Sequence, residues 1–317
     1  MRKIRIGVLC LLVLVVTGCS NEHFTAIDPH QSFVAAMNIL EPSLSFYDQT
    51  AQEITTWPFE KAYTGATLVG YDTVLLYGHQ LTEAELYELS SGKLLATLPT
   101  GIGVTNAYYD EESEKFFITN SKTNELSSYT MKGKPLQNVK LGNYPMSMIA
   151  YKGRLYVINY KDTTLSIIST DALHKLDEWK IPTSSHGLLI SVKANEMWIG
   201  GHGEGSQPND KVHVYDLSTG QRKSDIETPL MPVGFAQHEG EVAIASHGSN
   251  MVYKTQLDGK VISQQELAAN PFAVAYFKNY LIVAGYDDQI IYFMNGQQIQ
   301  HQVTSGKGPF QLLVREG

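Results

Sequence analysis

Two short stretches in the middle of the chain decide the fold. They are Gly142-Asn143-Tyr144-Pro145-Met146-Ser147-Met148 and, seven residues on, Leu155-Tyr156-Val157-Ile158-Asn159. Proline suits the first position of a strand, because the backbone N–H that it lacks is not needed there. A continuous apolar run such as the second stretch is typical of a strand that is buried on both faces. The two stretches therefore predict neighbouring strands, an inner one that begins with proline and a buried second one.

Both stretches recur along the chain. Copies of the first begin at Pro232, Pro271 and Pro309, and copies of the second cover 116–120, 197–200, 242–245 and 281–284. A third strand with a bulky residue near its end then follows, at Tyr47, Tyr87, Tyr129, Ile168, Tyr215, Tyr253 and Tyr292, with spacings of 40, 42, 39, 47, 38 and 39 residues. A period of about 40 residues filled with short strands predicts propeller blades, each a four-stranded sheet.

The two ends of the chain complement each other. Residues 309–314 have the pattern of an inner strand, whereas 32–37, 44–47 and 53–59 have the pattern of a second, third and fourth strand. These segments predict one composite blade, which closes the ring and removes the exposed sheet edges. The predicted fold is therefore an all-β, seven-bladed β-propeller over residues 32–317. A count of six or eight blades stays open if one of the seven bulky residues is spurious or another is hidden.

Several of these motifs resemble a known family. Phe117-Ile118-Thr119-Asn120 and Tyr156-Val157-Ile158-Asn159, the Gly-x-x-Pro opening of the inner strand, and Tyr215-Asp216 followed by Thr219-Gly220 resemble the YVTN family of seven-bladed propellers. The resemblance covers residues 32–317 and implies a fold that is common among secreted bacterial proteins, with no shared catalytic set. The chain departs from the pattern at Ile168, and only two repeats keep the asparagine that ends the second strand.

The N-terminus resembles a bacterial lipoprotein signal. Basic residues in 1–5 precede an apolar run over 6–16, and Val16-Thr17-Gly18-Cys19 follows. Residues 4–18 are too few for a transmembrane helix, which needs about 20. We therefore predict a signal peptide over 1–18, lipidation with palmitate-like acyl chains at Cys19, and a lipidated linker over 19–31. This lipoprotein would be anchored in the cell membrane, on its extracytoplasmic face.

Composition excludes several kinds of chemistry. The chain has two cysteines, and Cys10 would leave with the signal peptide, so no disulfide, thiolate metal site or cysteine nucleophile is expected. Signal removal also takes away three basic residues and moves the formal net charge from −8 to −11. An acidic protein repels phosphate backbones, so nucleic acid is not an expected partner. We predict a monomer without a cofactor, whose membrane contact comes from the lipid.

Polar and aromatic residues gather in loops that should share one face around the channel. The predicted ligand face comprises His186, His202, His247, Tyr144, Asn159 and Tyr286. Only the three histidines, from two adjacent blades, could meet on a metal ion, and the simpler interpretation is that they end strands and face solvent. No metal is therefore predicted. The insertion at 200–211 accounts for the longest repeat spacing, and an ordinary mobile loop is favoured over a lid.

The usual catalytic signatures are missing. The chain has no Gly-x-Ser-x-Gly, Cys-x-x-Cys-His or His-Glu-x-x-His motif and no phosphate-binding loop. The favoured hypothesis is a non-catalytic, lipid-anchored binding propeller that recognises a protein, a peptide or a cell-envelope ligand. The alternative is a propeller hydrolase or lyase, similar to a lactonase, that uses the three histidines of the predicted ligand face.

Overall fold

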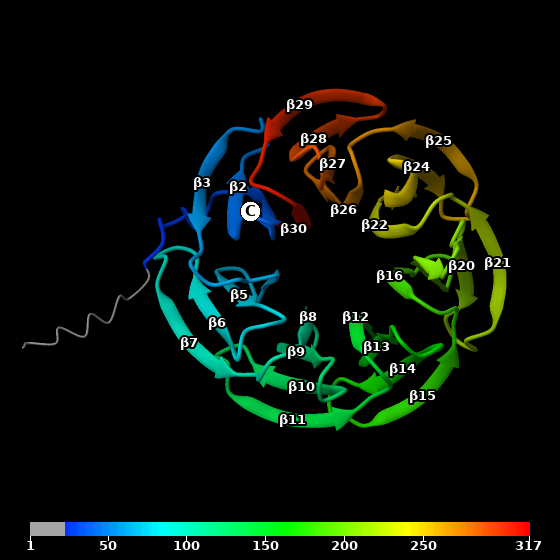
Figure 1. Ribbon diagram of the computed structural model, residues 1–317, viewed down its shortest axis with the longest axis horizontal. Coiled ribbons are helices and arrows are strands. Elements are labelled where there is room, and N and C mark those ends of the chain that lie inside the picture. The colour runs from blue at the N-terminus through cyan, green and yellow to red at the C-terminus, as the bar shows by residue number, and fades with distance from the viewer. Residues whose placement is uncertain (1–22) are drawn as a thin grey trace, which may run out of the picture.

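The computed structural model describes residues 23–317 as a ring of seven four-stranded antiparallel sheets (Figure 1). The sheets follow one another around the ring in chain order, and in six of them the first strand in the chain lies next to the ring axis and the last on the outside, whereas the C-terminal strand lies innermost in the remaining sheet. The prediction of an all-β, seven-bladed propeller is therefore confirmed.

The described residues form thirty short strands, of which twenty-eight make up the seven blades. Blade 1 consists of β30 (Pro309–Arg315), β1 (Phe33–Asn38), β2 (Ser43–Tyr47) and β3 (Glu53–Pro58); blade 2 of β4 (Gly65–Leu68), β5 (Thr73–Tyr77), β6 (Glu83–Glu88) and β7 (Leu94–Pro99); blade 3 of β8 (Val104–Asp110), β9 (Lys115–Asn120), β10 (Glu125–Thr130) and β11 (Pro135–Lys140); and blade 4 of β12 (Pro145–Tyr151), β13 (Arg154–Asn159), β14 (Thr164–Ser169) and β15 (Lys175–Lys180). Blade 5 consists of β16 (Ser185–Ser191), β17 (Glu196–Gly201), β20 (Lys211–Asp216) and β21 (Arg222–Glu227); blade 6 of β22 (Pro232–His238), β23 (Glu241–Ser246), β24 (Met251–Gln256) and β25 (Val261–Glu266); and blade 7 of β26 (Pro271–Phe277), β27 (Tyr280–Gly285), β28 (Ile290–Asn295) and β29 (Gln298–Thr304). The insertion in blade 5 forms a small hairpin of β18 (Gly203–Glu204) and β19 (Gln207–Pro208), and η1 (His247–Ser249) is a single 3-10 turn.

The two ends of the chain close the ring. In Figure 1 the red strand β30 lies beside the blue strands of blade 1, and its residues pair antiparallel with β1 from Phe33 and Arg315 at one end to Asn38 and Pro309 at the other. The sheet order β3-β2-β1-β30 is that of the predicted composite blade. Every blade therefore has an inner strand, and the ring has no open edge between its first and last blades.

Six of the seven inner strands begin with a break in the pairing register. In β8, β12, β16, β22 and β26 the shift follows the first residue, and in β30 it lies between Pro309 and Gln311. A bulge of this kind leaves one or two residues out of the ladder and turns their side chains in a new direction. The residues directly after the first one in each of these strands are Thr105, Met146, His186, Val233, Phe272 and Phe310.

The bulky residues that mark the repeat all lie in third strands, as predicted. The first five occupy the fifth position of their strands, and the strand pairing shifts next to each of them. In the last two blades the equivalent positions are Thr255 and Met294, so Tyr253 and Tyr292 lie two residues earlier. Residues two apart in a strand share a face, so a bulky residue at the third position of the strand gives nearly the same repeat spacing as one at the fifth position.

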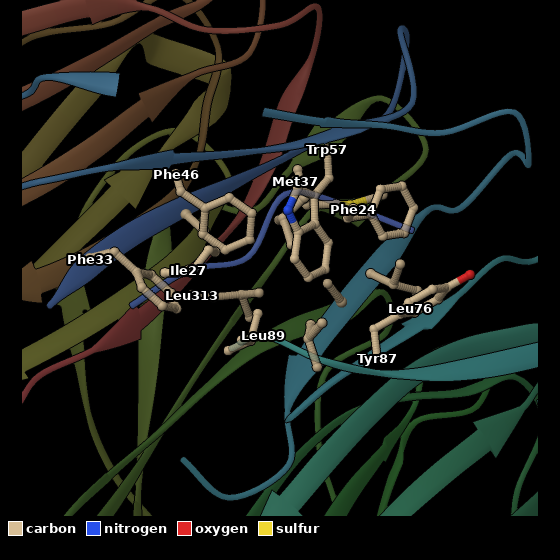
Figure 2. Close-up of a cluster of buried hydrophobic side chains, with 14 of the residues drawn as sticks. Phe24, Ile27, Phe33, Met37, Phe46, Trp57, Leu76, Tyr87, Leu89 and Leu313 are labelled. Atoms are coloured by element: carbon tan, nitrogen blue, oxygen red, sulfur yellow. The ribbon is translucent and has the colours of Figure 1, made fainter. Parts of the chain in front are cut away.

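The described part of the predicted linker belongs to the folded ring. Phe24 stacks on Trp57 with ring centroids 4.7 Å apart, and the Trp57 indole N–H donates to the backbone oxygen of Thr25 at 2.9 Å. Ile27 is buried in the same cluster between blades 1 and 2 (Figure 2). The prediction of a linker over 19–31 is therefore wrong for residues 23–31. The predicted signal peptide and Cys19 lie outside the described residues.

Within residues 23–317, no helix has the length and hydropathy that a membrane crossing requires.

Candidate ligand-binding site at the channel mouth

One position recurs at the same end of every blade, just after the second strand. It is occupied by Ile39, His79, Ser121, Tyr160, His202, His247 and Tyr286. The backbone N–H of most of these residues donates to the carbonyl of the residue before an inner strand, for example His202 to Ser184 at 3.0 Å and Tyr160 to Tyr144 at 2.9 Å. This backbone hydrogen bond, which we call the tether, keeps the recurring position close to the ring axis, where a ligand can approach.

The residues that accept these tethers adopt the left-handed backbone region. Glycine fills the position in two blades, but Tyr144 (φ 61°), Ser184 (φ 53°), Met231 (φ 56°) and Asn270 (φ 57°) fill it elsewhere. Residues other than glycine are uncommon in this region and are enriched at functional sites, where the surrounding structure holds the strained conformation. Four of the fifteen non-glycine residues with a positive φ in the described chain therefore lie at this recurring position.

Aromatic and imidazole rings contact one another in an unbroken series around the mouth. From blade 2 to blade 1 the ring centroids are separated by 6.4 Å (His79–Tyr144), 6.0 Å (Tyr144–Tyr160), 6.1 Å (Tyr160–His202), 5.1 Å (His202–His247), 4.4 Å (His247–Phe272) and 5.1 Å (Phe272–Phe310). His186 joins the series at His202, and Tyr286 joins it at Phe272. We call these nine residues the aromatic rim.

Below the rim lies a cavity of about 270 Å³ along the ring axis. One part of its wall is apolar, with Phe235, Phe272, Val274, Phe310 and Leu312. Another part is polar, with Thr64, Tyr77, Thr105, Asn106, Ser147 and Gln311. Ligand pockets combine apolar contacts with polar groups that fix the orientation of the ligand, and this cavity offers both.

The three predicted histidines form one cluster in the rim. The ring centroids of His186 and His202 are 5.3 Å apart, and those of His202 and His247 are 5.1 Å apart. Burial, together with the neighbouring imidazoles, lowers the pKa of His186 and that of His202 to about 4. Burial also lowers the pKa of His247, against the opposing effect of a hydrogen bond to Asn270. The cluster is therefore uncharged at neutral pH.

Five of the six predicted face residues lie in the rim, and Asn159 does not. Its side chain is fully buried, and its Nδ2 donates to the hydroxyls of Thr164 at 2.9 Å and Ser166 at 3.0 Å. Asn159 is the last residue of β13 and lies within the ladder, whereas the following residue, Tyr160, leaves the ladder and enters the rim. The placement of Asn159 on the ligand face is therefore corrected to a structural position beneath it.

Phe272, Phe310, Tyr160 and His79 belong to the rim but were not among the predicted site residues. Phe272 and Phe310 share a sequence signal, since each directly follows the proline that opens an inner strand. The register shift after that proline places both rings at the cavity wall. Tyr160 and His79 could have been found from their equivalence to His202 and His247 in the repeat.

Nearby carboxylates hold loops in place. Asp162 accepts a hydrogen bond from the backbone N–H of Asn143 at 2.6 Å, and Asp288 accepts from the backbone N–H of Ala269 and from the Tyr292 hydroxyl. Over residues 23–317, no group of three or more His, Cys, Asp or Glu side chains is placed so that it could hold a metal ion. The described rim therefore offers aromatic faces and neutral imidazoles, and these two acidic groups are engaged in structural contacts.

Comparison with known proteins supports the fold alone. No protein-family model and no curated protein sequence matches the chain. Solved structures do match: a functionally unknown protein from Desulfotomaculum acetoxidans (10% identity, 90% of this chain and 99% of that chain, TM-score 0.76), BamB from Moraxella catarrhalis (12%, 92% and 90%, 0.62) and virginiamycin B lyase from Staphylococcus aureus (14%, 76% and 83%, 0.63). The chain is thus similar to propellers of mixed roles, and its function has to be argued from its own rim.

Proposed function

We propose that this protein is a lipid-anchored binding propeller on the extracytoplasmic face of the cell membrane. Its aromatic rim would take up an aromatic or apolar group of a protein, a peptide or a cell-envelope ligand. The observation that supports this proposal is the unbroken series of rings above a cavity with one apolar and one polar wall. Stacked and edge-to-face contacts of such rings favour a ligand that presents a ring or an apolar group of its own.

The electrostatics of the rim favour binding over acid–base catalysis. An efficient general acid or base has a pKa near the working pH. The pKa of His186 and that of His202, lowered to about 4, make these imidazoles weak bases that are already neutral. A hydrolase or lyase is the second candidate, because three imidazoles lie close together. An enzyme could use them if its substrate supplied the acid.

The lipid anchor would sit close to the ring. His23, which pairs with Lys93 on the outside of blade 2, is only four residues after Cys19. Four extended residues span at most about 14 Å. A lipid on Cys19 would therefore hold the outer edge of blades 1 and 2 near the membrane surface. Limited proteolysis of intact membranes tests this geometry. We expect the outer edge of blades 1 and 2 to be protected from the protease, and this protection to be lost when a long Gly/Ser segment is inserted after Cys19.

Partner capture from solubilised membranes tests the binding proposal. The full-length protein is compared with a Tyr144→Ala/Phe272→Ala double variant, which removes two rings of the rim, and with Leu95→Ala, a matched control at an exposed apolar residue of β7. We expect mass spectrometry to identify partners that the parent and the control retain and the double variant loses. Identical partners for all three proteins, with both variants folded, would rule out the rim as the binding site.

A further inference from the structure

Three ring nitrogens in the histidine cluster have no hydrogen-bond partner. They are Nδ1 of His186, Nδ1 of His202 and Nε2 of His247, and all three are shielded from solvent. Buried polar atoms in native proteins almost always have partners, and an exception calls for an explanation such as an unseen ion. Three exceptions in one cluster of touching rings point to a shared cause.

The opposite nitrogen of each ring is held by the protein. His247 Nδ1 lies 2.8 Å from Asn270 Oδ1, and His186 and His202 each hydrogen-bond to a backbone group, at Val233 and Ser184. With an oxygen as acceptor, each of these nitrogens carries the hydrogen. The unpartnered nitrogens therefore carry lone pairs. This is the arrangement of histidines that bind metals, which donate their second ring N–H to a carbonyl or carboxylate oxygen.

The spacing of the rings also suits a common metal ion. A zinc–nitrogen bond is about 2.0–2.1 Å, so two imidazoles on one tetrahedral ion have ring centroids about 5 Å apart. The observed separations are 5.3 Å and 5.1 Å, with His202 as the shared member. As placed in the described part of the chain, no group of three such side chains could hold a metal ion, so the half-buried rings would have to turn toward one another before they could bind one.

We propose that His186, His202 and His247 bind one divalent transition-metal ion at the channel mouth through imidazole nitrogen. A set of neutral imidazoles without a carboxylate suits zinc, copper, nickel or cobalt, whereas calcium and magnesium prefer oxygen ligands. Three protein ligands leave further coordination positions open. The inference goes beyond the proposed function, because it requires no organic ligand or partner.

Metal titration of the chelator-treated, tag-free full-length protein in detergent tests the proposal. We expect one Zn²⁺ per chain by calorimetry, and the visible absorption of a nitrogen-ligated site on titration with Co²⁺. His202→Phe keeps a ring in the rim but removes the lone pair, so the folded variant should lose saturable binding. His238→Ala, at an exposed histidine elsewhere in blade 6, should bind like the parent.

Asn270 provides a second and more specific test, as a positioning residue for His247. Asn270→Ala should weaken Zn²⁺ binding by about 10–100-fold, and Asn270→Asp, which restores an oxygen acceptor, should recover most of the loss. Absence of saturable binding to the parent, or unchanged binding in folded His202→Phe, overturns the metal site. Partner capture is repeated in excess chelator to separate failure of the metal site from failure of the proposed function. Capture depends on the aromatic rings alone, so we expect it to persist when metal is removed.

Discussion

The closing strand β30 allows the ring architecture to be tested with two adjacent residues. Leu313 pairs with Ala35 of β1 and is 8% exposed, within the cluster that contains Trp57 (Figure 2). Leu312 is only partly buried and lines the axial cavity. The two leucines share a strand, a residue type and a ladder, but they face different surroundings.

The expected losses follow from these surroundings. Leu313→Ala removes a buried side chain from a packed cluster, so it loses both the transfer free energy and the cavity term, for a total of about 3 kcal/mol within the range of about 2–5 for such changes. Leu312→Ala adds space to an existing cavity and loses only part of the transfer term, about 1 kcal/mol. The free energy of unfolding should therefore differ by about 2 kcal/mol between the two variants.

Urea unfolding followed by tryptophan fluorescence measures both losses, because Trp57 lies in the same cluster as Leu313. Equal losses, or a Leu313→Ala protein within about 1 kcal/mol of the parent, would show that β30 does not close the composite blade as described. Deletion of 309–317 provides an independent check. It removes β30, the inner of the two strands that pair with β1, and three hydrogen bonds from the Arg315 guanidinium to the backbone oxygens of Asp28 and Gln31, so it should destabilise the chain more than either substitution.

Three further predictions concern the anchor and the histidines. Cys19→Ala should give a folded protein that no longer sediments with membranes after a salt wash, and persistent sedimentation would refute the lipid anchor. Joint replacement of His186, His202 and His247 by alanine should abolish partner capture with little change in melting temperature, whereas a large fall would identify the three as structural residues. The pKa of His186 and that of His202 are lowered from 6.5 to about 4, so the unfolded chain binds more protons between these values. The stability associated with the neutral rings is therefore complete above pH 6.5 and lost as the pH falls toward 4, and a His186→Phe/His202→Phe variant should show a shallower decline in urea unfolding across that window.

Most of the fold could be predicted from local pattern. The strands expected at 32–37, 44–47, 53–59 and 309–314 are observed at 33–38, 43–47, 53–58 and 309–315. The strands at 33–38 and 43–47 are buried along their whole length, so their apolar runs can be read without their neighbours. The docking of 23–31 could not be predicted in this way. Phe24 and Ile27 are isolated apolar residues without periodicity. The partner of Phe24, Trp57, lies in the third strand that follows it in the sequence, so the contact is not visible in the local pattern.

The site shows the same division between local pattern and tertiary register. The equivalence of His202 and His247 follows from the repeat, so their meeting at the mouth could be predicted. The choice between Asn159 and Tyr160 could not, because it depends on which residue is the last in the ladder. Phe272 and Phe310 reach the cavity through a register shift that the sequence marks only with a proline.

This division explains why similar propellers need not share a function. The bulge after the first residue of an inner strand and the tether after the second strand are backbone features, and they recur in blades whose side chains differ, such as Ser121 in blade 3 and His202 in blade 5. A side chain at such a position contacts the channel mouth more than the core, so it can change with little effect on stability. Structures that are 10–14% identical to this chain can therefore keep the ring and replace the whole rim. The nine residues of the aromatic rim, with the three unpartnered ring nitrogens of its histidines, are accordingly the part of this protein in which its specific role has to be sought.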